Sequence, residues 1–149
     1  MTVRRGVNLV AVMAVASLAW GCESEAPQMR LPTESFTMQV ISDPQPPYAV
    51  ERVTWRITVR DRETRQPVEG GEGRLYATNL QQVTVWNGLA PGPELGTYIA
   101  TVLFPTAGQW GMAVEFRRDS TQVLEKIEWS QEVLRERAVP DVIPPPDSQ

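Results

Sequence analysis

The side chains that most often carry chemistry in proteins are nearly absent from this sequence. Its 149 residues contain no histidine and one cysteine, Cys22. Histidine is the commonest general base and proton carrier near neutral pH, and the commonest ligand of zinc and copper(II). A Ser-His-Asp triad and a Cys-His pair both require histidine, so the sequence excludes these two nucleophilic mechanisms.

Carboxylate chemistry remains open, because the chain has 18 Asp and Glu residues. Two carboxylates can act as general acid and general base when burial separates their pKa values. Here the acidic residues lie in expected loops, in the polar N-terminal segment or in stretches of mixed charge, and no pair interrupts an apolar strand. We therefore predict that the protein is not an enzyme, and keep a carboxylate-based hydrolase as a distant alternative.

Methionine is the remaining candidate ligand, because its thioether sulfur binds copper(I). Met38 alternates with Phe36 and Val40, and Met112 alternates with apolar residues in the same way. Methionine commonly fills gaps in hydrophobic cores. We expect Met38 and Met112 to be core residues and expect no cofactor; copper(I) binding or delivery through these two residues is the alternative function.

The N-terminus has the layout of a secretory signal. Arg4 and Arg5 precede an apolar run over residues 7–20, and Cys22 follows at the start of a polar segment. The sequence Leu-Ala-Trp-Gly-Cys at 18–22 resembles a lipobox, in which the cysteine is acylated and becomes the mature N-terminus. We predict a lipoprotein signal peptide over 1–21 and lipid attachment at Cys22. A secreted protein with one free thiol is the alternative.

Removal of residues 1–21 leaves an acidic mature chain. It carries 12 basic and 18 acidic groups, a formal charge of −6. We expect no basic patch or basic stripe, since the charge-dense stretches 60–65 and 135–137 mix both signs. The sequence therefore predicts no nucleic-acid partner.

Short apolar segments separated by Pro- and Gly-containing turns indicate an all-β protein. The clearest is 53–60, where Val53, Trp55, Ile57 and Val59 alternate strictly with polar residues. Strands are expected over 36–41, 53–60, 74–78, 83–86, 97–104, 110–116 and 121–134. Segment 121–134 could also line a helix, and we favour a strand. About seven strands at this spacing predict an immunoglobulin-like antiparallel β-sandwich.

Segments 97–104 and 110–116 hold the densest apolar clusters. The first is apolar on both faces, which predicts a central strand. A turn over 105–108 then leads us to expect that the second segment pairs with the first. On these two strands and on 53–60 and 121–134, the alternation predicts core positions for Trp55, Trp110 and Trp129.

The boundaries of the folded domain follow from composition. Residues 22–35 are polar and are predicted to form a flexible tether, residues 36–137 the sandwich domain, and residues 138–149 a Pro-rich disordered tail. Loop residues around 86–95 are the expected partner contacts: Trp86, Asn87, Leu89 and Leu95. Trp86 precedes Asn87-Gly88, which places an aromatic side chain at a loop mouth.

The phrase Gly96-Thr-Tyr98, an apolar strand, and then Ala107-Gly-Gln-Trp110 resembles the YtkA-like domain and its relative FixH. Gln66-Pro67-Val68 after the 53–60 strand resembles the same domain's opening. The resemblance covers roughly residues 36–129. It implies an extracytoplasmic immunoglobulin-like domain, copper handling, and accessory roles in assembling respiratory complexes. Residues 69–96 contain no Met, His or Cys that could form a soft-metal site.

These observations together predict a non-catalytic protein of the cell envelope. We expect it to be held at a membrane through an N-terminal lipid on Cys22, to face the periplasm or extracytoplasmic space, and to contact another envelope protein as a binding or accessory module.

Overall fold

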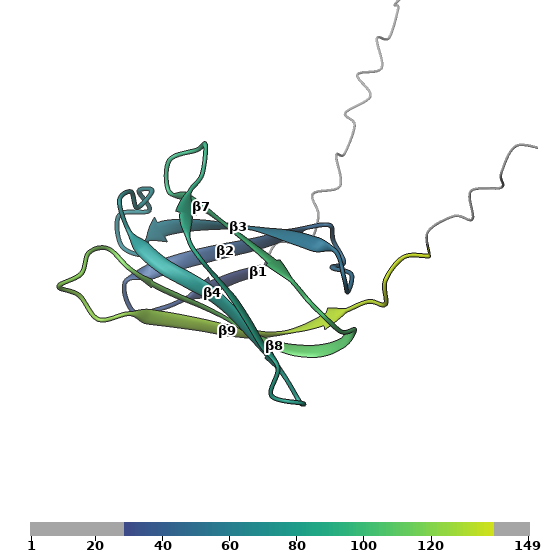
Figure 1. Cartoon of the computed structure of the whole chain (residues 1–149). Helices are drawn as coiled ribbons and strands as arrows, with labels where there is room; N and C mark the ends of the chain where they lie inside the picture. The colour runs from purple at the N-terminus through teal and green to yellow at the C-terminus, as the bar shows by residue number, and fades with distance from the viewer. Residues whose placement is uncertain (1–28, 139–149) are drawn as a thin grey trace, which may run out of the picture.

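The computed structural model describes residues 29–138, which form two antiparallel β-sheets packed face to face (Figure 1). The strands are β1 (Met29–Pro32), β2 (Phe36–Asp43), β3 (Arg52–Asp61), β4 (Glu72–Asn79), β5 (Thr84–Gly88), β6 (Ala90–Pro91), β7 (Thr97–Leu103), β8 (Gly108–Arg117) and β9 (Glu125–Val133). The first sheet has the order β1-β2-β3-β7-β6 and the second the order β5-β4-β8-β9. The predicted all-β, immunoglobulin-like sandwich is confirmed.

Strict alternation explains why β3 is the clearest strand. Its inward residues, including Val53 and Trp55, are at most 2% exposed. Its outward residues are half-buried or exposed. A strand that buries every second side chain can present a polar face to water at no cost to the core.

The core lies between the two inner faces, and edge-on aromatic contacts join the sheets across it. The ring of Phe116 lies 5.2 Å from Phe36 and 5.0 Å from Tyr98. The hydroxyl of Tyr98 donates to Val68 O at 2.8 Å, which fastens the β3–β4 loop to β7. Trp55 and Trp110 are core residues as predicted, whereas Trp129 is only partly buried against the core.

The expected pairing of segments 97–104 and 110–116 is wrong. β7 pairs with β3 and β6 in the first sheet, and β8 pairs with β4 and β9 in the second. The turn between them carries the chain from one sheet to the other, so their apolar residues meet across the core, as in the 5.1 Å contact of Phe104 and Trp110. β7 is an internal strand as predicted, but its outward face is uncovered, and Leu103 there is 44% exposed.

Two boundaries differ from the sequence prediction. Residues 29–32 of the expected tether form β1, which pairs with β2 and packs Leu31 against the core. The last strand is β9, which begins at Glu125 rather than at 121, and Val123 is exposed in the preceding turn. The favoured strand assignment for this segment is confirmed. Residues 1–28, with the predicted signal peptide and Cys22, lie outside the described residues, as does the tail after Ala138.

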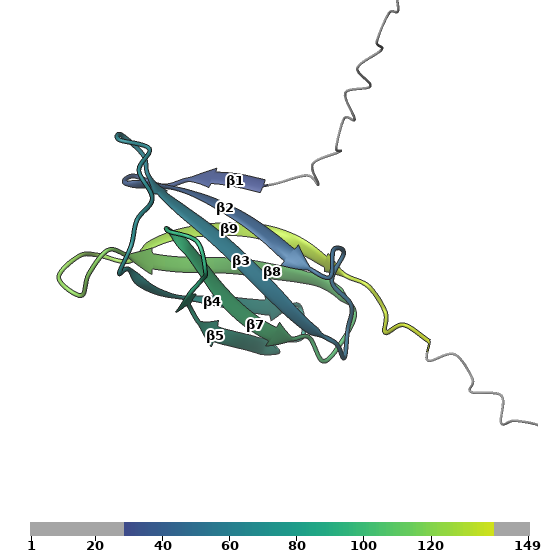
Figure 2. The same cartoon turned by 90° about the horizontal axis from the view of Figure 1, so that it is seen from above.

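The end of the domain is fastened to the β2–β3 loop, where the chain leaves the sandwich (Figure 2). Leu134 N–H donates to Pro47 O at 2.9 Å, and Ala49 N–H donates to Leu134 O at 2.8 Å. Beyond them, the Arg137 guanidinium pairs with Glu51 and lies over the Tyr48 ring, 4.7 Å from its centroid. We call this set of contacts the C-terminal clasp. Residues 29–138 contain no helix long and apolar enough to cross a bilayer.

Candidate functional site

The structure separates the four residues predicted to contact a partner. Trp86 and Leu95 are each 67% exposed, whereas Leu89 is partly buried and packs against the core. Adjacent residues of a strand face opposite sides, so Asn87 points away from the side on which Trp86 lies. Leu95 lines a separate pocket of about 150 Å³ in the loop before β7, whereas Trp86 belongs to the open outward side of the second sheet.

Trp86 lies on the outward side of the second sheet, in a row of four cross-strand neighbours. It pairs with Tyr76 on β4, Tyr76 pairs with Ala113 on β8, and Ala113 pairs with Glu128 on β9. In the next row Gly111 takes the place of Ala113 on β8. Two aromatic side chains therefore stand beside two of the smallest residues, and we call this outward side of the second sheet the aromatic face.

A shallow groove of about 410 Å³ lies on the aromatic face over Gly111 and Ala113. Tyr76 and Thr78 line one side, and Glu128 and Ser130 line the other. The Arg74 guanidinium lies over the ring of Tyr76, 5.5 Å from the ring centroid, and Arg74 Nε in turn donates to Glu115 Oε2 at 2.7 Å. The groove thus has a small-residue floor and one fixed aromatic wall.

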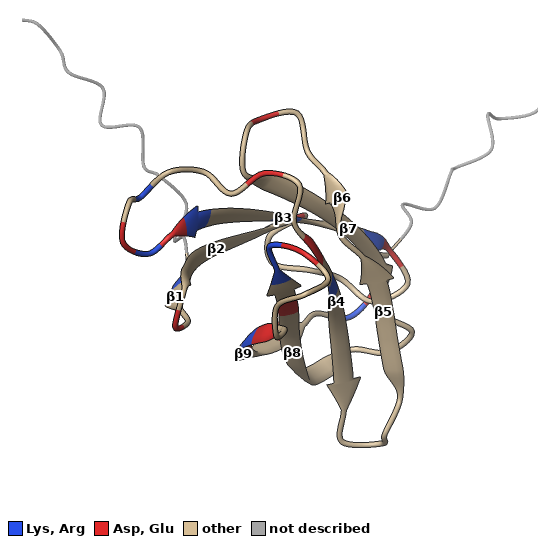
Figure 3. Ribbon diagram, turned by 90° about the vertical axis from the view of Figure 1, so that its left-hand side faces the viewer, with Lys and Arg blue, Asp and Glu red and all other residues tan. Residues whose placement is uncertain are grey.

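The outward side of the first sheet is different, because arginines gather there. Arg52, Arg56 and Arg60 occupy the outward phase of β3, Arg30 lies in the same phase on β1, and Arg65 follows in the β3–β4 loop. All five are exposed. Figure 3 shows β1 and β3 in one layer, opposite the layer of β4 and β5 that carries the aromatic face. We call this surface the arginine face.

Three of these arginines border one groove of about 200 Å³. Arg30, Arg60 and Arg65 line it together with three neutral polar residues, Thr37, Gln39 and Thr58. No carboxylate of residues 29–138 lines this groove. Guanidinium groups bind phosphate and carboxylate oxygens in pairs of parallel hydrogen bonds. The chemistry of the groove is therefore that of an anion site.

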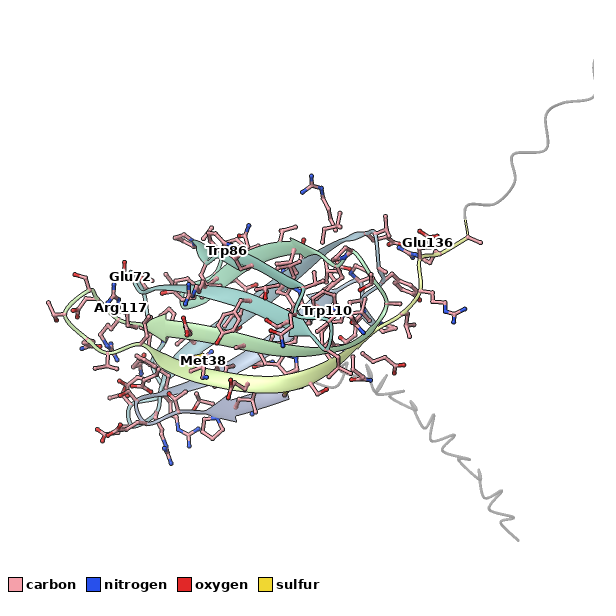
Figure 4. The ribbon with its side chains drawn as sticks, turned by 60° about the horizontal axis from the view of Figure 1, so that its bottom comes forward. Met38, Glu72, Trp86, Trp110, Arg117 and Glu136 are labelled. Carbon is pink, nitrogen blue, oxygen red and sulfur yellow. The ribbon has the colours of Figure 1, made fainter. Side chains whose placement is uncertain are left out.

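None of the five arginines forms an ion pair with a carboxylate of residues 29–138. The ion pairs in this part of the chain are Arg74–Glu115, Arg117–Glu72, Arg118–Asp61, Lys126–Glu128 and Arg137–Glu51. Among the described strand residues of the first sheet, one carboxylate faces outward, that of Asp43. Figure 4 shows one of the paired sets, Glu72 and Arg117, at an end of the second sheet.

The loop that carries Arg65 is held by Asp61. Asp61 Oδ1 accepts the N–H groups of Thr64 at 2.8 Å and Glu63 at 3.0 Å, and its Oδ2 accepts Arg118 at 2.8 Å. The hydrogen bond from Thr64, with those from Glu63 and Arg118, holds the pKa of Asp61 below its usual value despite some desolvation. Arg65 itself has a positive φ of 64°, and its carbonyl accepts Arg60 Nη1 at 3.1 Å.

The sequence interpretation missed the arginine face. The expectation of no basic patch is wrong, because Arg30 and Arg65 reach the face from segments that only strand pairing brings together. A partial signal was present in the outward phase of the 53–60 strand, where Arg56 and Arg60 alternate with buried residues.

The two methionines proposed as copper(I) ligands lie in opposite sheets. Met38 is 0% and Met112 1% exposed, and both belong to the hydrophobic core, as expected. Within residues 29–138, no group of three or more His, Cys, Asp or Glu side chains is placed to hold a metal ion. In the same range the buried polar residues are Ser42 and Thr97, and no carboxylate is buried.

No family model, curated protein or solved structure matches this chain. The resemblance to the YtkA-like domain therefore stays a prediction. Of what it implies, the structure shows the β-sandwich fold.

Proposed function

We propose that the protein is a non-catalytic, lipid-anchored module of the cell envelope that binds another envelope protein through its aromatic face. The observation that carries the proposal is Trp86, two-thirds exposed on the outward side of a sheet. Tryptophan is a large apolar side chain that is enriched at protein interfaces and among the few residues that carry most of the binding energy. The groove beside it offers a small-residue floor that a partner side chain can approach closely.

The anchor half of the proposal is supported by the sequence around Cys22. The residue follows an apolar segment and has no second cysteine in the chain with which to form a disulfide. Growth with a clickable fatty acid should label the wild-type chain, and Cys22→Ser should abolish the label. Equal labelling of both chains, or of neither, would refute lipid attachment at this residue.

The partner half can be tested by photocrosslinking in cells. A photoreactive amino acid placed at position 86 should give a discrete adduct in the envelope fraction. The matched control is position 123, since Val123 is 85% exposed but lies in the β8–β9 turn. Tyr76→Ala should weaken the adduct by removing a groove wall. Identical adducts from positions 86 and 123, or none from position 86, would contradict binding at the aromatic face.

The YtkA-like resemblance supports the same proposal. Such domains are extracytoplasmic and are often carried on lipoproteins or membrane anchors. A domain that assists a larger membrane complex needs an anchor to hold it at the membrane and an exposed surface to contact the complex. The lipid on Cys22 and the aromatic face would serve these two purposes.

A further inference from the structure

We propose that the arginine face lies against the anionic phospholipid headgroups of the membrane that holds the lipid anchor. This proposal rests on the proposed function, because the anchor is what brings the face to a bilayer. It adds an orientation: the first sheet faces the membrane, and the aromatic face on the opposite sheet points away from it, toward a partner.

The length of the connection limits how far the domain can be from the bilayer. Seven residue steps separate Cys22 from Met29, the first residue of β1. Even fully extended, they span at most about 25 Å. Arg30 is the next residue and lies on the arginine face. The anchor therefore delivers the chain to the membrane at the edge of the sheet that carries the arginine face.

The distribution of charge favours one orientation. The five arginines of the face and Asp43, the one carboxylate in the outward phase of the described strands of the first sheet, together carry a formal +4. The mature chain is −6, so subtracting the face leaves −10 for all the rest. An anionic membrane surface attracts the positive arginine face and repels the negative remainder of the chain. Both forces act over a Debye length, roughly 8 Å at physiological salt.

The geometry suits a plane of phosphates better than a single small anion. Arg52, Arg56 and Arg60 are four residues apart on one strand, which spaces them by about 13 Å. Only Arg30, Arg60 and Arg65 converge on the groove, where the hydroxyls of Thr37 and Thr58 can also donate to phosphate oxygens. A free phosphate would use the groove alone, whereas a headgroup layer can engage the whole sheet.

The test uses the full chain as purified from cells, with one thiol introduced at a time. Thr58→Cys places a thiol on the arginine face, and Thr78→Cys places one in the outward phase of the second sheet. Each chain is mixed with vesicles of phosphatidylcholine alone or with 30 mol% phosphatidylglycerol. Vesicle flotation reports anchoring, and the rate of modification by a bulky maleimide-polyethylene glycol reports which face is covered.

Position 58 should react at least about tenfold more slowly on the anionic vesicles than on the neutral ones, and position 78 should react equally on both. Each arginine near an anionic surface changes the equilibrium constant for binding that surface about fivefold. The double variant Arg30→Gln, Arg60→Gln should therefore restore most of the reactivity at position 58. Arg74→Gln removes the same kind of charge from the aromatic face and should restore none. High salt should act like the double variant.

Failure of the anchor and failure of the inference give different results. An unacylated chain would not float with neutral vesicles, and its own Cys22 would be modified without any introduced thiol. An anchored chain with equal rates at position 58 on both vesicles would overturn the inference. Protection of position 58 by inorganic phosphate on neutral vesicles, with none from phosphatidylglycerol, would instead assign the groove to a free anion and would also overturn it.

Discussion

The outer faces of the two sheets differ in how their charges are arranged, although both sheets are built over the same core. On the second sheet, cations have carboxylate partners, as in Arg74–Glu115 and Lys126–Glu128. On the first sheet, arginines collect with no such partner among the described residues. The inner residues must fit one another, but outward residues are free to vary. The net charge of this acidic chain therefore describes neither of its two outer faces.

The largest expected effect on stability comes from truncating one large side chain in the core beneath both faces. Trp110 is fully buried, and its indole N–H donates to Thr106 O at 3.1 Å. Trp110→Ala should lower the free energy of unfolding by about 3–5 kcal/mol. Trp86→Ala removes the same side chain from the aromatic face and should cost under about 0.5 kcal/mol. Urea unfolding followed by circular dichroism compares them; equal losses would mean that Trp86 is a structural residue.

A second comparison uses two glycines of the second sheet. A Cβ at Gly73 would lie 2.1 Å from Glu115 O, so Gly73→Ala must push β4 away from β8 and should cost about 1–3 kcal/mol. A Cβ at Gly111 would lie 3.6 Å from Thr78 O, an ordinary contact. Gly111→Ala should therefore be neutral or stabilising by up to about 1 kcal/mol while filling the groove floor. Denaturant midpoints measure both, and a destabilised Gly111→Ala would show that the floor is already packed.

A smaller effect should separate the two classes of arginine. Arg74→Gln breaks an ion pair and should lower the free energy of unfolding by about 0.2–1 kcal/mol at low salt, less at high salt. Arg56→Gln removes one of several like charges and should be neutral or slightly stabilising. Thermal unfolding at two salt concentrations provides the measurement. If Arg56→Gln were the more destabilising change, the arginine face would contain an attractive partner.

The smallest expected effect is one of pH on the loop beside the arginine face. The folded pKa of Asp61 is lowered, chiefly by the Thr64 N–H hydrogen bond, so its carboxylate stabilises the fold above the ordinary pKa of about 4. That contribution is lost as pH falls through the lowered folded pKa. Asp61→Asn should therefore unfold more easily than the wild type at pH 7, and the gap should narrow by pH 3. A gap independent of pH, in thermal midpoints, would point to a loss of shape rather than of charge.

Most of the fold could be predicted because alternation reveals which side of a strand is buried. The inward residues of β3 and the burial of Met38 and Met112 followed from it directly. Alternation does not say which strands are neighbours, and the expected pairing of β7 with β8 failed for that reason. Short edge strands such as β1 and β6 contain too few residues to show a period.

The candidate surfaces were less predictable than the fold. Trp86 stood out as one exposed aromatic residue, but its neighbours Tyr76 and Ala113 are adjacent only through cross-strand pairing. The arginine face had the same difficulty, because Arg30 and Arg60 are 30 residues apart in the chain. A surface assembled from several strands has no signature in any one segment.

The C-terminal clasp has a mechanical consequence. A chain fixed by lipid at its N-terminus and pulled through its last residues would carry tension along the sandwich. The clasp takes that load first, because Arg137 and Glu51, and then the Leu134 hydrogen bonds to Pro47 and Ala49, stand between the tail and β9. The load passes into the β2–β3 loop of the opposite sheet, so the two sheets share it. The edge strand β9 is thereby protected from being pulled away from β8 one residue pair at a time.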